Sequence, residues 1–455
     1  MKHLIPILNI MLAAALLSAC AGPASTPTVA TTNSPPANTP VAVNPTHTPG
    51  SSQPLPAGVA VSNKQRITKP AATATDISQL VSGSTAFAFV LYQALGASGT
   101  GNLFYSPYSI SIALAMAQAG ARGDTLSQIN QVLHFSLPGE TLHQAFNALQ
   151  LDLANRARNA DQPDQNDFSL NIANATWGQA GYQFLPTYLD VLAENYGAGM
   201  RLVDFKTDPE KARQLINDWV AQQTAQKIPD LIPAGQLDAM TRLVLTNAIY
   251  FKAAWESTFA EKSTTSDTFT NLDGKQVKTP MMRQQASFDY TKGNGYQAVR
   301  LPYSADKLSM LVILPDAGKF TDFEKSLTPA QLDTIRKNLA SATLNLSLPK
   351  FKYTSSFALG DTLQKMGLKD AFNPSAADLS GMDGTRNLSI SSVLHKAYVN
   401  VDENGTEAAA ATAVVIGVTS MPVDVIDFKI DRPFIFLIQD NQTGSILFMG
   451  RVVTL

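Results

Sequence analysis

The chain has 455 residues, with 34 Lys and Arg against 36 Asp and Glu, and a formal net charge of −2. This length suits one large domain or two to three average ones, and the near-neutral charge gives no reason to expect nucleic acid or an acidic polymer as a partner. The only cysteine is Cys20, so no disulfide can form within the chain and packing alone must hold the core.

The N-terminus has the shape of a signal peptide. A basic residue at position 2 precedes an apolar run that ends in Leu-Ser-Ala-Cys at 17–20, and small residues before a cysteine resemble the bacterial lipobox. We predict that residues 1–19 are a lipoprotein signal peptide and that Cys20 carries lipid. The alternatives are a plain secretory signal with a chance cysteine and a transmembrane anchor, which the short run broken by Pro6 and Asn9 disfavours.

Residues 20–75 have a composition that cannot bury a core. They are rich in Pro, Thr, Ala, Ser and Asn, and Lys64, Arg66 and Lys69 are their only charged residues. We predict a disordered, lipid-anchored stalk. The protein is then expected to be secreted and anchored at the bacterial cell surface, or on the periplasmic or extracellular face of a membrane.

From Asp76 to residue 455 the sequence predicts one folded domain, in which helical signals come early. Ser106 is a good N-cap and Pro107 a good first helical residue, and Gly120 can end that helix. Two further helical faces carry Phe87, Val90, Leu91, Ala94 and Leu95, and Leu215, Ile216, Trp219 and Val220.

Strand signals dominate later in the chain. They are the apolar or alternating runs "RLVLTNAIYF", "LSMLVILP", "ATLNLSLPKF", "FIFLIQD" and "SILFMGRVV". Asp273-Gly274 is a hairpin turn pair. Because helices and strands do not alternate regularly, the expected fold class is α+β with a large mixed or antiparallel sheet.

The sequence lacks the common motifs of enzyme active sites. It contains no H-E-x-x-H, no Cys and His cluster for zinc, no G-x-S-x-G elbow and no P-loop or dinucleotide fingerprint. A Ser-His-Asp triad built from distant residues is not visible in a sequence. We therefore predict a protein that is not an enzyme and needs no metal and no cofactor.

Residues 404–422, "NGTEAAAATAVVIGVTSMP", combine conflicting local preferences. Thr406 could cap a helix that continues through the alanines, but the β-branched run at 414–416 prefers a strand. Read as a strand, the segment turns small residues to one side, and no proline lies between Gly405 and Ser420. Such a segment could be a loop in one state and an inserted strand in another.

The segment "LHKAYVNVDENGTEAAAATAVV" closely resembles the hinge of the serpins, the serine-protease-inhibitor superfamily. The resemblance covers about residues 77–455 in order, and it includes "NLFYSPYSISIALAMAQAGARGDT", "INDWVAQQTAQKIPDLI", "TRLVLTNAIYFKAAWESTF", "LPKFKYTSSFALGDTLQKMGL" and "DRPFIFLIQDNQTGSILFMGRVV". It implies a metastable fold of three β-sheets and about nine helices with an exposed reactive-centre loop. It further implies that a protease which attacks the loop is trapped as an acyl-enzyme when the cut loop enters the central sheet.

The resemblance also implies the residues of the hinge and of the reactive bond. The hinge residues are Gly405, Thr406, Glu407, Ala408, Ala409, Ala410, Ala411 and Thr412. The family's spacing places the reactive bond between Thr419 and Ser420, with attack after Val418 or Ser420 as the alternatives and attack after Met421 disfavoured by the following proline.

Two further sites follow from the resemblance. The shutter, a polar network where the central sheet opens, is expected at Ser106, Ser109, Asn247 and His395. The breach, where the loop enters the sheet, is expected at Trp255, Lys350 and Glu403. The chain departs from the family there, because Lys252-Ala253-Ala254-Trp255 replaces the usual Lys-Gly-x-Trp.

The expected partner is an elastase-like or subtilisin-like serine protease, because Gly417, Val418 and Thr419 are small and uncharged. A cysteine protease is the cross-class option, and a monomer is expected. Arg156 and Arg158 stand alone in the region where some family members bind heparin, so no heparin-activated mechanism is expected. The alternative function is a non-inhibitory serpin fold used as a surface binding or chaperone module, which the hinge composition disfavours.

Overall fold

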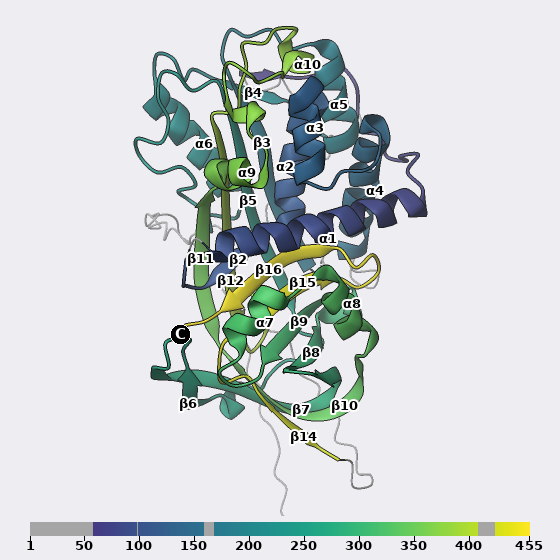
Figure 1. The fold of residues 1–455 in the computed structure, drawn as a ribbon, viewed down its shortest axis with the longest axis vertical. Helices are drawn as coiled ribbons and strands as arrows, with labels where there is room; N and C mark the ends of the chain where they lie inside the picture. The colour runs from purple at the N-terminus through teal and green to yellow at the C-terminus, as the bar shows by residue number, and fades with distance from the viewer. Residues whose placement is uncertain (1–57, 98, 159–167, 408–423) are drawn as a thin grey trace, which may run out of the picture. The chain divides into compact units, whose positions relative to one another are not determined.

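The computed structural model describes residues 58–97, 99–158, 168–407 and 424–455 (Figure 1). The predicted signal peptide, Cys20, residues 408–412 of the hinge and the predicted reactive bond lie outside the described residues. The predicted α+β class is confirmed by the arrangement of helices and sheets.

Ten α-helices occur among the described residues, close to the expected nine. They are α1 (Ala74–Ala97), α2 (Pro107–Gly120), α3 (Gly123–Val132), α4 (Gly139–Ala157), α5 (Pro186–Tyr196), α6 (Pro209–Gln223), α7 (Phe320–Ser326), α8 (Pro329–Lys337), α9 (Gly360–Met366) and α10 (Ser380–Asp383). The predicted ends of α2 are confirmed, and the Ser106 side chain accepts a hydrogen bond from the amide of Ser109 as an N-cap should.

The central sheet has seven strands. Their order is β1 (Val59–Ala60), β4 (Met200–Val203), β3 (Phe168–Gln179), β5 (Leu243–Ala254), β13 (Gly405–Thr406), β12 (Ser392–Asp402) and β11 (Phe351–Ala358). Outside the two residues of β13, the strands β5 and β12 pair directly with each other. This pairing is parallel and runs from Val244 opposite Ser392 to Tyr250 opposite Tyr398. The short strand β13 therefore enters a sheet that is closed over the rest of its length.

The other strands form one continuous sheet of nine. Its order is β14 (Ile426–Lys429), β10 (Ala340–Pro349), β7 (Gln276–Gly293), β8 (Tyr296–Pro302), β9 (Leu308–Pro315), β15 (Phe434–Asp440), β16 (Ile446–Val452) and β2 (Leu103–Tyr105), with β6 (Thr265–Thr270) paired to β7. When the described strands are grouped by their hydrogen bonds, they form two sheets and not the expected three. The reason is that β7 pairs with β6 over residues 276–281, with β10 over 281–290 and with β8 over 289–293, so it links these strands into one sheet.

One large apolar cluster fills the space between the two sheets and α1, α2, α4 and α5, and a smaller one lies between α6 and the outer face of the central sheet. Within α1, four of the five residues predicted on the buried face are covered at least in part, but Val90 is 45% exposed. This helix is long and apolar enough to cross a membrane by composition alone. Its contacts with α2, α4 and β16 make it a core helix of the folded domain.

The predicted stalk overlaps the ordered structure. Residues 58–67, which we call the strap, pack on the domain: β1 pairs with the edge strand β4, and the amide of Ile67 donates to the Glu194 carbonyl at 2.8 Å. Arg66 donates to the side chains of Asn147 at 2.8 Å and Gln150 at 2.6 Å. The predicted boundary at residue 76 is therefore too late, because backbone pairing and a few polar contacts order a segment whose composition alone cannot form a core.

Candidate functional site

The hinge occupies the entrance of the central sheet as far as it is described. Gly405 pairs with Ala254 on β5 and Asp402 on β12, and Thr406 pairs with Ala253 and Val401. These pairings are antiparallel on both sides, so Gly405 and Thr406 already form the first two positions of a strand between β5 and β12. Ala253, by which the chain departs from the serpin motif, and its neighbour Ala254 are the residues of β5 that receive the hinge.

Gly405 fits this place because it has no side chain. Its φ is +152°, and a Cβ added to it would stand 2.1 Å from the carbonyl oxygen of Ala253. Real Cβ atoms do not approach oxygen that closely, so any other residue would have to move the hinge or β5. The docked position of the hinge thus depends on glycine at this point.

Thr406 is held on the core side of the sheet. It is 1% exposed, and its hydroxyl lies 2.7 Å from the hydroxyl of Tyr303. Trp255 stacks on the Tyr303 ring, with centroids 4.6 Å apart, and its indole N–H donates to the Asp402 carbonyl at 3.0 Å. Burial raises the pKa of Tyr303, so this hydroxyl remains protonated and available as a donor.

The predicted partners at the breach meet. The Nζ atom of Lys350 donates to Glu403 Oε2 at 2.6 Å, and the hydroxyl of Thr264 donates to Glu403 Oε1 at 2.8 Å. Burial acts to raise the pKa of Glu403, but these two hydrogen bonds outweigh it and leave the pKa below its ordinary value. The carboxylate is charged, buried and held directly before the hinge.

Glu407 marks the point where the docked hinge ends. Its φ is +52°, in the left-handed region that non-glycine residues rarely adopt, and its amide donates to the Asn400 carbonyl at 2.9 Å. Its carboxylate bonds to Lys227, from the turn that follows α6. Burial acts to raise the pKa of Glu407, and Lys227 outweighs it, so the pKa lies below its ordinary value.

The four predicted shutter residues form one network with no exposed surface. His395 Nδ1 bonds to Asn247 Oδ1, and its Nε2 accepts from the amide of Ser106 at 3.2 Å. Since Nε2 is an acceptor, this pattern assigns the proton to Nδ1. Asn247 donates to the hydroxyl of Ser109 at 2.6 Å. Burial lowers the pKa of His395 to about 3.

This network spans the seam that an entering strand must open. His395 and Asn247 are register partners on β12 and β5. Separating these strands would break their bond, while Ser106 and Ser109 at the start of α2 would stay behind. The predicted shutter residues are thus brought together where the predicted movement needs them.

Sequence reasoning missed four members of these sites. They are Asn174 on β3, which accepts from Ser109, together with Tyr303, Thr264 and Lys227. A polar residue inside an apolar strand is a signal for Asn174, because a buried amide must find partners. Nothing local marks the other three, whose roles arise from distant segments meeting.

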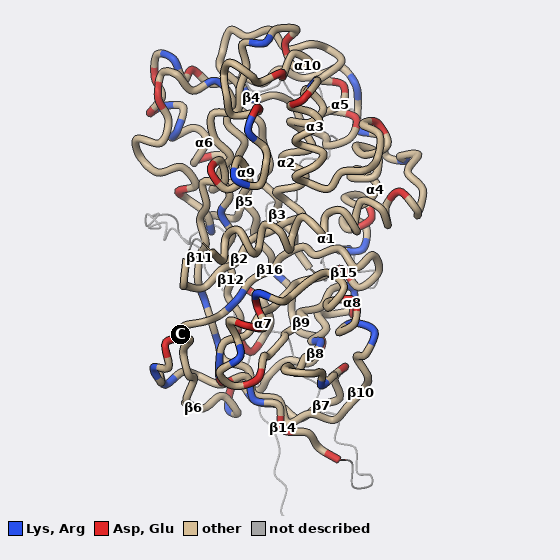
Figure 2. The backbone as a smooth tube through the Cα atoms, viewed as in Figure 1, with Lys and Arg blue, Asp and Glu red and all other residues tan. Residues whose placement is uncertain are grey.

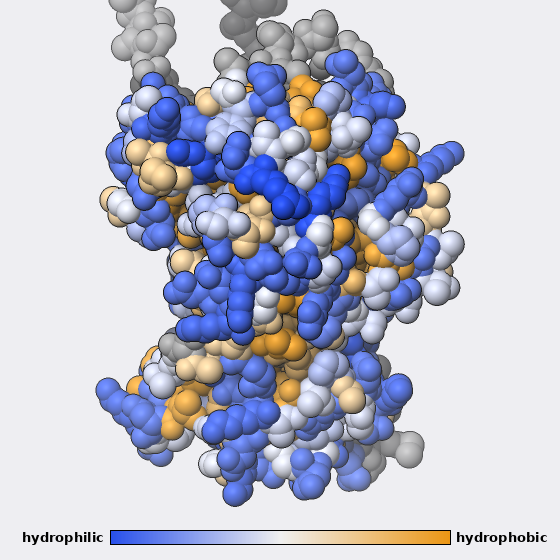
Figure 3. All heavy atoms as spheres, turned by 45° about the horizontal axis from the view of Figure 1, so that its top comes forward, coloured by the Kyte–Doolittle hydropathy of each residue, from blue (hydrophilic) through white to orange (hydrophobic). Residues whose placement is uncertain are grey.

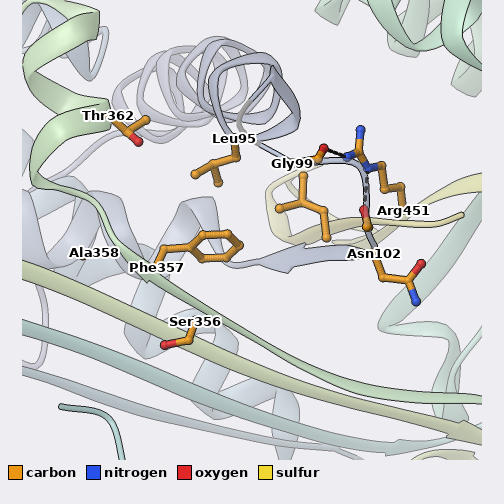
Figure 4. Close-up of a pocket in the computed structure, with 10 residues that line it drawn as sticks. Leu95, Gly99, Asn102, Ser356, Phe357, Ala358, Thr362 and Arg451 are labelled. Atoms are coloured by element: carbon orange, nitrogen blue, oxygen red, sulfur yellow. Dashed lines mark hydrogen bonds between the residues drawn. The ribbon is translucent and has the colours of Figure 1, made fainter. Parts of the chain in front are cut away.

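Two other features do not form a site. A hollow of about 300 Å³ lies between α1, β2, β11 and α9 (Figure 4), but the Arg451 guanidinium at its wall already donates to Gly99, Gly101 and Glu324. Arg156 is bound to Asp152 and to the buried Asp440. Basic and acidic residues are interleaved along the described backbone (Figure 2). Among the described residues no group of three or more His, Cys, Asp and Glu could hold a metal ion.

Comparisons with known proteins agree with this geometry. The family model described as "Serpin (serine protease inhibitor)" matches residues 82–455. The chain is 41% identical over 377 residues to a serpin-like protein of Thermococcus kodakarensis, covering 82% of this chain and 85% of that protein. It is 40% identical over 383 residues to the human leukocyte elastase inhibitor, covering 82% and 98%.

The solved structures agree as well. The native state of the thermophilic serpin tengpin matches with a TM-score of 0.75 and 28% identity, covering 87% of this chain and 98% of that one. The chain therefore belongs to the serpin family, which is described as a family of serine protease inhibitors, and it is not an enzyme.

Proposed function

We propose that the chain inhibits serine proteases by acyl-enzyme trapping, with insertion of its reactive loop between β5 and β12. The observation that carries this proposal is the docked hinge, which already pairs with both strands in the register of a new strand. Small residues follow the hinge in the sequence, so the register can continue without overpacking the core.

The register of the docked hinge against β5 predicts the position of each loop residue after insertion. Thr406 lies opposite Ala253, so each following residue steps one position back along β5, and Ile416 would reach Leu243, the first residue of that strand. The residues at 408, 410 and 412 would then face the core, as Thr406 does. Their small size matches the space between packed layers.

The covalent step follows from ordinary acyl transfer. The serine hydroxyl of the protease attacks the Thr419 carbonyl, the bond to the Ser420 nitrogen breaks, and the hydroxyl proton leaves with the new amine. Hydrolysis of the ester needs the oxyanion hole of the protease, and loss of one donor there costs roughly 10²–10³ in rate. Insertion that pulls on Thr419 would arrest the reaction at the ester.

An elastase-like or subtilisin-like target is proposed from the uncharged residues 417–419 and from the similarity to leukocyte elastase inhibitors. A cysteine protease would be trapped as a thioester in the same way. We also propose that Cys20 anchors the protein by lipid outside a bacterial cell, from the signal sequence alone. The alternative function, a non-inhibitory binding or chaperone module, would need a hinge that cannot insert.

The first experiment mixes residues 20–455, carrying Cys20→Ser, with an elastase-like or subtilisin-like protease. We expect a complex that survives denaturing electrophoresis at the summed mass and a released peptide that begins at Ser420. Clean cleavage without a complex across a panel of serine and cysteine proteases would favour the non-inhibitory module. A peptide with another first residue would move the reactive bond without overturning inhibition.

A matched pair of variants separates insertion from binding. Ala410→Glu would place a charge opposite the fully buried Ile249, whereas Ala409→Glu would place it opposite Tyr250, on the face where Lys227 and Lys352 approach Tyr398. We expect Ala410→Glu to be cleaved as a substrate with little complex and Ala409→Glu to retain trapping. Equal trapping by both variants would contradict insertion in this register.

A further inference from the structure

Half of an apolar helix face predicted from the sequence is left uncovered by the fold. Of the four residues predicted on one face of α6, Ile216 and Val220 are fully buried in the smaller apolar cluster. Leu215 is 48% exposed, and Trp219 is partly exposed. These two residues are four positions apart, so they are neighbours on the surface of the helix. The proposed trapping function makes no use of them.

The indole of Trp219 is held in place by its contact with the central sheet. It meets the Trp177 ring of β3 edge to face, with centroids 5.5 Å apart and ring planes at 76°. The Trp177 indole N–H donates to the Thr246 hydroxyl on β5 at 2.9 Å, and Trp177 itself is buried. Trp219 therefore rests on a fixed, buried base and presents a defined ring face.

Arg201 on β4 lies over that ring. It is the register partner of Trp177, and its Cζ atom is 4.3 Å from the centroid of the Trp219 ring and 5.4 Å from that of Trp177. Stacking occupies the flat face of a guanidinium and leaves the N–H groups on its rim free to donate. Burial lowers the pKa of Arg201 to about 10, so the group is partly desolvated but remains charged at neutral pH.

The charge of Arg201 has no counterpart in the part of the chain that the structure describes. Its guanidinium stacks on the two indoles and donates to none of the described oxygens. The acids that follow it in the chain are engaged, because Asp204 accepts from the Thr207 hydroxyl and Asp208 accepts from the Lys211 amide as the N-cap of α6. The other described arginines that are at least partly buried all donate to an oxygen, and they are Arg66, Arg156, Arg213, Arg242, Arg283, Arg300, Arg336, Arg432 and Arg451.

The segments outside the described residues do not supply a carboxylate at this place. Residues 1–57 and 408–423 contain no Asp and no Glu. Residues 159–167 contain three Asp, but they lead into β3 at Phe168, nine residues or about 30 Å along the strand from Trp177. An acidic partner for Arg201 is therefore expected from another molecule.

We propose that Leu215, Trp219 and Arg201, which we call the α6 strip, bind a peptide segment of another protein that carries an acidic side chain next to an apolar one. The carboxylate would accept a pair of hydrogen bonds from the rim of the Arg201 guanidinium. The apolar neighbour would cover Leu215 and the exposed edge of Trp219. This inference goes beyond the proposed trapping function and does not depend on it.

A protein segment suits the α6 strip better than a small organic acid. Small molecules bind in concave sites that enclose most of their surface, whereas Leu215 lies on an exposed helix face. Trp and Arg are among the residues that most often anchor protein interfaces. Figure 3 turns the top of Figure 1 forward and shows small apolar groups set among hydrophilic residues. A partner on such a surface gains more from a few anchors than from broad apolar burial.

The test uses the three tryptophans of the chain as reporters. Isotope labelling of the indole nitrogens gives NMR signals from Trp177 and Trp219 at the α6 strip and from Trp255 at the hinge. Residues 20–455 carrying Cys20→Ser are titrated with the peptide acetyl-Ala-Leu-Asp-Leu-Ala-amide. Two matched peptides accompany it, one with Asn in place of Asp and one with Gly in place of both Leu.

We expect the Trp219 signal to shift saturably with the Leu-Asp-Leu peptide while the Trp255 signal stays in place. The Asn and Gly peptides should each bind roughly tenfold more weakly or worse, because one lacks the charge and the other the apolar contact. Arg201→Gln should weaken the Leu-Asp-Leu peptide by a similar factor. Arg158→Gln, which removes the same charge from an exposed arginine, should leave its binding unchanged.

Leu215→Ala keeps the test independent of any effect of Arg201→Gln on folding, since it changes an exposed position to a good helix former. It should weaken the Leu-Asp-Leu peptide and leave the Gly-Asp-Gly peptide unaffected. Equal binding of the Asp and Asn peptides, or unchanged binding in Arg201→Gln or in Leu215→Ala, would overturn the inference.

Two other occupants of the α6 strip have their own outcomes. A Trp219 shift with phosphatidylglycerol vesicles but not with the Leu-Asp-Leu peptide would assign the strip to a lipid surface. A shift produced by raising the protein concentration alone would assign it to a second copy of the chain. Either result would also overturn the inference, and neither bears on the trapping of a protease.

Discussion

Gly405 is the residue on which the docked hinge depends most directly. Gly405→Ala would place a Cβ 2.1 Å from the Ala253 carbonyl oxygen. The backbone of β5 cannot move away from this Cβ without breaking its hydrogen bonds to the neighbouring strands. We expect the hinge to leave the sheet and amide exchange at Glu407 and Trp255 to rise roughly tenfold or more, equivalent to about 1.4 kcal/mol. Both amides donate to carbonyls that hold the hinge, those of Asn400 and Asn404.

Hydrogen exchange followed by mass spectrometry would measure this effect. Gly139→Ala is the matched control, because a Cβ at that position meets nothing within 4 Å. Unchanged protection of the hinge amides in Gly405→Ala would show that β5 can accommodate the methyl group and that glycine is not needed for docking.

His395 makes the stability of the shutter depend on pH. Its pKa is lowered to about 3 by burial, whereas an unfolded histidine has a pKa of about 6.5. Below pH 6.5 the histidine is protonated in the unfolded chain but not in the folded protein. Its contribution to the free energy of unfolding is therefore complete above this pH and is lost as the pH drops toward 3. The slope for one proton is about 1.4 kcal/mol per pH unit.

We therefore expect His395→Gln to flatten the pH dependence of unfolding free energy by about 1.4 kcal/mol per unit between pH 5.5 and 4. Denaturant unfolding at a series of pH values measures this slope. The buried His143, whose pKa is lowered to about 4, stays in both proteins and cancels in the difference. Parallel curves for the two proteins would mean that His395 titrates equally in both states.

At the scale of elements, the docked register joins the hinge to the shutter. Thr412 would arrive opposite both Asn247 and His395, the pair whose mutual bond must break when β5 and β12 part. Its hydroxyl can donate and accept, so it can satisfy both groups. Inserted without that hydroxyl, the sheet would leave buried polar groups unpaired at about 1–3 kcal/mol.

Thr412→Val should accordingly slow insertion and divert the reaction to cleavage, so that more inhibitor molecules are consumed per protease trapped. Titration of residual protease activity measures this ratio. Thr412→Ser keeps the hydroxyl and should behave as the wild type, and the intact Thr412→Val protein should melt normally because Asn247 and His395 still bond. An unchanged ratio in Thr412→Val would argue against this register.

Local sequence patterns predicted the helices and strands better than they predicted the contacts between them. The ends of α2 and the apolar runs of β9, β10, β15 and β16 were readable because caps and strand propensity act within a few residues. Tyr303 and Lys227 had no such signal, since each contacts the hinge from a different part of the fold. The strap was missed because its order depends on the edge of β4 and on α4, and its own composition is that of a coil.

At the scale of the whole molecule, the proposed mechanism would open the seam between β5 and β12. The two strands pair in parallel, a slightly weaker arrangement than antiparallel pairing. Insertion of residues 407–416 in the docked register would replace this one parallel seam with two antiparallel ones and bury Val414 and Ile416 on the core side. On the proposed mechanism, the uncut connection between the loop and β14 would hold back insertion in the intact chain.

Cutting the loop should therefore stabilise the protein. A non-target protease that cleaves near Thr419 and dissociates should raise the Tm by roughly 10 °C or more. At about 2–4 °C per kcal/mol, this shift corresponds to a gain of about 2.5–5 kcal/mol. Calorimetry of intact and cleaved samples measures the change. The Ala410→Glu protein, whose cut loop cannot bury its charge opposite Ile249, should gain little. A cleaved wild type that melts with the intact protein would show that the closed seam is already the more stable arrangement.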